Sequence, residues 1–276
     1  MSTDLLIRET DRTTTSPSFS RHVLAKDLRE RAVPTLGIGA ALFSFAMFAL
    51  GIYSGLSEQL DQLTENMPEE MLSFIGGDAP GGYVVGETFD LLAPLVLVAY
   101  AIMSSASALA GEEESGTMGL LAAQPVARRS ILAAKVIGLL LAVVAIGAMF
   151  FGGTALAASI FDIPLETVNV LAACVHLVFL AAAFGAIAIA IGAATGKPGP
   201  AAAGAGGLAV LSYLTASMLP LADLDGWARI SPWYYYNGGD PLTSGIDGLH
   251  LLVLSAITGI ALVLAFRAFD RRDLRS

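Results

Sequence analysis

The polar side chains most able to act together lie in one short connection, residues 111–130. Three carboxylates are followed by a Gly-Thr pair, a short apolar turn, a proline and two arginines; the residues are Glu112, Glu113, Glu114, Gly116, Thr117, Met118, Leu120, Leu121, Pro125, Arg128 and Arg129. Charged groups of this kind form charge-assisted hydrogen bonds with a partner, and the apolar turn can fill a cleft. The pattern predicts protein docking, and the alternative is a solvated turn whose charges only set topology.

Residues with the spacing of a catalytic or metal site are not evident in the sequence. The only Gly-Lys pair, Gly196-Lys197, is followed by proline and lacks the upstream glycine of a phosphate-binding loop. The three histidines are far apart in the chain: His22, His176 and His250. We therefore expect no catalytic residue, no metal and no cofactor in this chain, so it is not expected to be an enzyme.

Three further polar residues fall within or beside apolar segments. Glu87 and Asp90 are three apart, so they share a helix face, where they form an outer gate or vestibule or are simply hydrated. His176 lies inside an apolar segment, where polar groups line pathways or make interhelical hydrogen bonds. Each remains a candidate with two interpretations.

Composition indicates the class of protein that positions these residues. Apolar residues make up 55% of the 276 residues, charged residues 14%, and the mean hydropathy is +0.70. A soluble domain of this length cannot bury so much apolar surface, whereas a polytopic membrane protein exposes it to lipid. The net charge of −9 disfavours nucleic-acid binding, and the acidic, lysine-poor composition is typical of haloarchaeal proteins.

Hydrophobic segments about 20 residues long predict six transmembrane helices in an all-α fold, because such a helix spans a bilayer core. We expect a disordered cytoplasmic N-terminus at 1–17, an amphipathic interfacial helix at 18–32, a transmembrane domain at 33–267 and a cytoplasmic tail at 268–276. The six spans are expected at about 33–55, 84–110, 131–160, 167–194, 200–220 and 247–267.

The distribution of basic residues predicts the orientation. With six spans, every arginine and lysine except Arg229 falls on the side that holds both termini. Cytoplasmic loops carry an excess of basic residues, so both termini and the 111–130 connection are expected in the cytoplasm of a multi-pass cell-membrane protein.

The connection resembles the cytoplasmic coupling loop of type-2 ABC transporter permeases, the membrane subunits of ATP-driven exporters. An amphipathic entry helix, six spans and the ending Phe269 to Leu274 extend the resemblance along the chain. The residues at matching positions of the loop are Glu112, Glu113, Glu114, Gly116, Thr117, Leu120, Leu121, Pro125, Arg129 and Lys135. Within the family the chain most resembles permeases grouped with multicopper-enzyme maturation and nitrous-oxide-reductase assembly.

This resemblance implies partners. A separate ABC ATPase subunit would bind ATP and Mg and dock on a short coupling helix in the connection. A second permease copy or a paralogue would complete the pathway, with the first, second and fifth spans at the seam. Small residues such as Gly37, Gly51 and Gly55 in the first span allow close helix approach there or within one subunit.

Two rival functions belong to other classes. An ion-coupled secondary transporter or channel with no ATPase partner needs carboxylates near mid-membrane, where alanine, glycine, valine and leucine dominate this chain. An intramembrane enzyme needs a nucleophile with a base or a set of metal ligands. The permease subunit of an ABC exporter is therefore the function that agrees best with the sequence.

Overall fold

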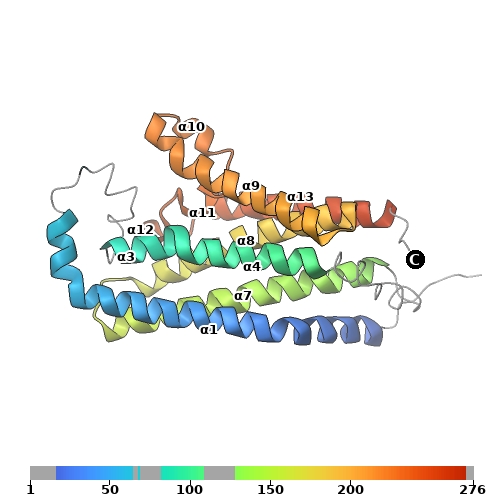
Figure 1. The fold of residues 1–276 in the computed structure, drawn as a ribbon, viewed down its shortest axis with the longest axis horizontal. Helices are drawn as coiled ribbons and strands as arrows, with labels where there is room; N and C mark the ends of the chain where they lie inside the picture. The colour runs from blue at the N-terminus through green and yellow to red at the C-terminus, as the bar shows by residue number, and fades with distance from the viewer. Residues whose placement is uncertain (1–16, 65–67, 69–81, 109–127, 272–276) are drawn as a thin grey trace, which may run out of the picture.

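The computed structural model describes residues 17–64, 68, 82–108 and 128–271, which form an elongated bundle of helices (Figure 1). Within these ranges six helices are long and apolar enough to cross a membrane: Leu24–Gly55, Val84–Ala106, Arg129–Ile160, Thr167–Thr195, Pro198–Met218 and Gly248–Arg271. The prediction of an all-α polytopic membrane protein with six transmembrane helices is confirmed.

The described elements include short helical turns between the long spans. In chain order the described elements are α1 (Pro17–Thr64), α3 (Gly82–Glu87), the π-helix η1 (Thr88–Leu92), α4 (Ala93–Ala106), α7 (Arg128–Ile160), α8 (Thr167–Thr195), α9 (Pro198–Met218), the 3-10 helix η3 (Pro220–Ala222), α10 (Asp225–Ala228), α11 (Tyr234–Asn237), α12 (Pro241–Ser244) and α13 (Gly248–Arg271).

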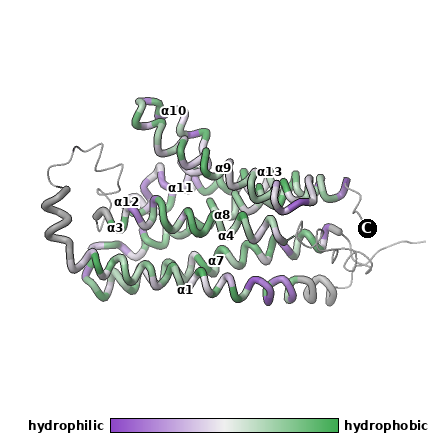
Figure 2. The backbone as a smooth tube through the Cα atoms, in the orientation of Figure 1, coloured by the Kyte–Doolittle hydropathy of each residue, from purple (hydrophilic) through white to green (hydrophobic). Residues whose placement is uncertain are grey.

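Helix α8 lies at the centre of the bundle. It contacts α4, α7, α9 and α13, and 67% of its most apolar window is buried inside the protein, against 22% for α9 and for α13. Helix α1 packs along α7 on one side of the bundle, and α9 and α13 lie on the other (Figure 1). The exposed faces of the outer helices are apolar, as expected of surfaces in contact with lipid (Figure 2).

The first helix is longer than the sequence indicates. A boundary between an interfacial helix at 18–32 and a span beginning at residue 33 is predicted, whereas α1 is one continuous helix from Pro17 to Thr64 that passes through Pro34. Pro34 is exposed, and the helix on both sides of it packs against α7. Tertiary packing therefore overrides the tendency of proline to end a helix.

The second span contains a local change of helix type. Pro94 lacks a backbone N–H, and the turn before it, η1, widens so that the N–H of Ala93 bonds to the carbonyl of Thr88. The carbonyl of Phe89 therefore has no backbone donor at the positions four and five residues ahead. The Tyr236 hydroxyl donates to it at 2.5 Å and fixes α11 against the second span.

Glycines determine how closely α1 and α7 approach. A Cβ atom on Gly153 would lie 2.7 Å from the backbone oxygen and 2.8 Å from the Cα of Phe43, whereas one on the adjacent Gly152 would lie 3.9 Å from the Phe43 ring. A Cβ atom on Gly153 is therefore impossible unless one of the two helices moves, whereas a Cβ atom on Gly152 would make an ordinary van der Waals contact.

We expect Gly153→Ala to lower the free energy of unfolding by about 1–3 kcal/mol, because the added methyl overpacks the α1–α7 seam. Gly152→Ala is the matched control, and its higher helix propensity should leave stability equal or slightly raised. Cys174, the single cysteine, is buried, so thermal unfolding can be followed with a thiol-reactive dye. Equal unfolding temperatures for the two variants would contradict the close approach.

Candidate functional site

Most of the predicted docking residues lie in the part of the chain that the structure does not describe. These are Glu112, Glu113, Glu114, Gly116, Thr117, Met118, Leu120, Leu121 and Pro125, all within residues 109–127. Arg128 begins α7, and the Arg129 side chain is described. The guanidinium of Arg129 donates to the Asp270 carboxylate from Nε at 2.9 Å and from Nη2 at 2.6 Å. The start of α7 and the end of α13 therefore meet beside the connection.

A buried ionic cluster lies one to two helical turns deeper in the same end of the bundle. The two oxygens of Asp27 bind two cations, with Oδ1 3.0 Å from Nζ of Lys135 and Oδ2 2.7 Å from Nε of Arg31. The three residues are 3%, 3% and 7% exposed, respectively. A Cβ atom on Gly138 would collide with the Asp27 carboxylate, so the glycine on α7 makes room for the cluster.

The cluster joins three helices. Asp27 and Arg31 come from α1 and Lys135 from α7, while Nη1 of Arg31 donates to the hydroxyl and the carbonyl of Ser104 on α4. One turn further along α1, the Thr35 hydroxyl lies 2.7 Å from that of Tyr100 on α4. Helices α4 and α7 are the two that flank residues 109–127, so the cluster ties both of them to α1.

The cluster is not predicted from the sequence. There Arg31 counts only among the basic residues that set topology, Lys135 belongs to the coupling-loop pattern, and Asp27 has no assigned role. The available signal was the spacing of Asp27, Arg31 and Thr35 at intervals of four, which places three polar residues on the face that continues into buried Leu42. A charged pair on such a stripe predicts a charged partner on the helix it packs against.

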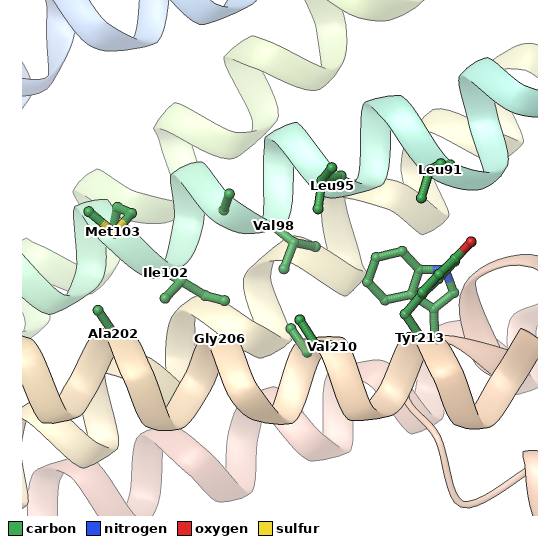
Figure 3. A pocket seen from close by; sticks show the side chains of 12 residues that line it. Leu91, Leu95, Val98, Ile102, Met103, Ala202, Gly206, Val210 and Tyr213 are labelled. Atoms are coloured by element: carbon green, nitrogen blue, oxygen red, sulfur yellow. The ribbon is translucent and has the colours of Figure 1, made fainter.

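Two hollows open on either side of α4. The larger, about 820 Å³, lies between α1 and α4 and reaches Lys135. The smaller, about 240 Å³, lies between α4 and α9, and its lining is almost wholly apolar (Figure 3). Ala99 and Met103 line both hollows, so the two hollows adjoin along α4. The surface formed by α1, α4 and α9 is therefore hollowed on both sides of α4.

The predicted outer gate residues lie at the opposite end of the bundle, where the second span begins. Glu87 ends α3 and Asp90 lies in the π-helix, and both are half-buried. The Asn237 side chain of α11 donates to the Asp90 carboxylate at 3.4 Å. Asp90 therefore contacts α11, which precedes the last span, and a gate or vestibule role for the two acids stays a prediction.

The aromatic residues between α9 and α13, which lie within residues 227–236, differ in burial. Trp233 and Tyr236 are 3% and 1% exposed and belong to the core, whereas Trp227 is 62% exposed. Trp233 packs edge-on against Tyr213 and Tyr236 at ring-centroid distances of 5.2 and 6.4 Å. Burial raises the pKa of Tyr236 well above its ordinary value, so this hydroxyl stays a hydrogen-bond donor.

The predicted pathway residue, His176, is buried on α8. Its Nδ1 lies 2.9 Å from the carbonyl of Ala172 in the same helix, and its Nε2 has no hydrogen-bond partner among the described residues. It lines neither hollow. A pathway role for His176 stays a prediction.

At the start of α13, the Asp247 carboxylate accepts hydrogen bonds from the backbone N–H groups of His250 and Leu249, and these bonds lower the pKa of the carboxyl.

Six membrane-spanning helices with α8 at their centre, and a polar connection in the sequence between the second and third, define the class as a multi-pass membrane protein. The model of the ABC-2 family transporter protein matches residues 21–274, which is nearly the whole chain. The chain belongs to this family, whose members are membrane subunits of ABC transporters and are generally not catalytic. No curated protein matches the chain. The resemblance to permeases grouped with multicopper-enzyme maturation and nitrous-oxide-reductase assembly stays a prediction.

Proposed function

We propose that this chain is the permease subunit of an ATP-driven ABC exporter and that residues 111–130 couple it to a separate ATPase subunit. The observation that carries the proposal is the clustering of charge beside that connection. The Arg129–Asp270 ion pair and the buried Asp27 cluster both lie at the end of the bundle where α7 begins.

Positive charge supports a cytoplasmic location for this end. Among the described residues, the basic side chains at the end of the bundle that holds the start of α1 and the end of α13 are Lys26, Arg29, Arg31, Arg129, Lys135, Lys197, Arg267 and Arg271, and only Arg229 lies at the other end. By the positive-inside rule this distribution supports a cytoplasmic location for the connection, where ATP and Mg would be available to a partner ATPase.

The two hollows beside α4 support a second subunit. Helices α1, α4 and α9 surround the two hollows, and Gly37 and Gly55 on α1 have open space where a Cβ atom would stand. Gly51 does not share this property, because it packs against the Phe161 ring of its own chain. We propose that a second copy or a paralogue covers this face and completes the pathway.

Cysteine labelling tests the orientation on which coupling depends. Gly199 lies in the first turn of α9, and Gly226 lies in α10 at the opposite end; a Cβ atom at either has nothing within 4 Å. In intact cells, an impermeant thiol reagent should label Gly226→Cys and leave Gly199→Cys unlabelled until the membrane is permeabilised. The reverse pattern would place residues 111–130 outside the cell, where no ATPase could bind them, and would refute the proposal.

A further inference from the structure

The hollow between α1 and α4 has two chemically different parts. Its base is polar and carries the Asp27–Arg31–Lys135 cluster with Ser104 and Ser107. Its upper wall is apolar; the residues are Pro34, Ile38, Val96, Ala99 and Met103. Through Ala99 and Met103 the apolar wall continues into the second hollow, which ends at Tyr213 (Figure 3). A space that is polar at one end and apolar along its length fits an amphiphile.

Arg31 provides an available donor at the polar end. Its Nε donates a hydrogen bond to Asp27, and its Nη1 donates to Ser104. Its Nη2 makes no hydrogen bond to a described residue and retains accessible surface. A guanidinium presents its N–H groups in a plane that matches the oxygens of a phosphate or a carboxylate. The two N–H groups on Nη2 can therefore bind an oxyanion in the hollow.

The acidic side chains of the hollow do not offer an equivalent site for a cation. Both oxygens of Asp27 are bound to cations of the cluster. Glu30 pairs with Lys26 at 3.5 Å, and both of these side chains are about half exposed. The charge of the available groups therefore favours a ligand whose headgroup carries an oxyanion.

We propose that this hollow binds the phosphate or carboxylate headgroup of a membrane amphiphile, with Arg31 as its donor and the hydrocarbon tail along α4. The inference rests on the proposed function, because it names the class of cargo that the exporter takes up. Val96 and Met103 would contact the first part of the tail, and the apolar hollow between α4 and α9 would hold its continuation.

Native mass spectrometry of the purified full chain, without any ATPase, tests the proposal by counting bound lipid. The probes are phosphatidic acid, diacylglycerol with the same acyl chains but no oxyanion, and inorganic phosphate. We expect phosphatidic acid to bind more tightly than diacylglycerol, and inorganic phosphate not to displace it. Because a hydrogen bond to a charged group is involved, Arg31→Met should weaken phosphatidic acid binding about tenfold or more.

A second variant covers the case in which Arg31→Met fails to fold. Ala99→Phe fills the apolar wall from an exposed position and touches no ion pair, so it should block lipid binding in a folded protein. Ala256→Phe, at an exposed position on α13, is the control and should bind as the unmodified chain does.

Equal binding of the two lipids, or unchanged binding in Ala99→Phe, would overturn the site. Displacement by inorganic phosphate would show that a free oxyanion, and not an amphiphile, is the ligand. Because the assay contains no ATPase, lipid binding by a chain that recruits no ATPase would keep the site and refute only the exporter.

Discussion

Asp27→Ala is expected to lower the free energy of unfolding by about 3–5 kcal/mol, the usual cost of removing one partner from a buried ion pair. The change takes away the carboxylate that Arg31 and Lys135 share, while both cations stay less than a tenth exposed. Buried charge costs far more without its counter-ion, because the low-dielectric surroundings solvate it poorly. Thermal unfolding of the purified protein, reported by the exposure of Cys174, measures the effect.

Glu30→Ala is the matched control for Asp27→Ala. Glu30 lies on the same helix and also pairs with a lysine, but that pair is about half exposed on both sides. Exposed ion pairs contribute about 0–1 kcal/mol, so this variant should unfold close to the original temperature. Similar losses for the two variants would mean that the cluster does not hold α1, α4 and α7 together.

The spans of this protein are predictable from sequence because each depends on local composition. The predicted span 167–194 matches Thr167–Thr195, and the turn after it follows from Gly196, whose φ of 66° glycine adopts without strain. The continuity of α1 through Pro34 is not predictable in this way. It depends on packing against α7, which no local propensity contains.

The buried cluster is not predictable from the sequence for a similar reason. Sequence alone does not distinguish buried from exposed charged residues in the first part of α1, because all of them fit a hydrated basic helix. These residues are Lys26, Asp27, Glu30 and Arg31. Only the packing of α1 on α7 decides that Asp27 and Arg31 face Lys135, whereas Lys26 and Glu30 face outward. Similarly, the position of Tyr236 depends on the π-helix η1, where the Phe89 carbonyl accepts a hydrogen bond from the Tyr236 hydroxyl.

Leu121→Asp is expected to leave membrane insertion intact and to uncouple ATP hydrolysis from transport. We propose that Leu121 inserts into an apolar cleft of the ATPase, so a carboxylate there must be desolvated without a partner. A cost of 1.4 kcal/mol already corresponds to about tenfold in affinity, so the association should weaken by at least that factor. Leu221→Asp is the control, because Leu221 is exposed at the opposite end of the bundle.

The central claim is that this chain works with a separate ATPase that binds residues 111–130. The most direct measurement is the amount of ABC ATPase that is recovered when the affinity-tagged full chain is purified from native membranes. The account predicts an ATPase in stoichiometric yield with the original chain and with Leu221→Asp, and a yield about tenfold lower with Leu121→Asp. Recovery of the original chain without any ATPase, or equal recovery with Leu121→Asp, would contradict it.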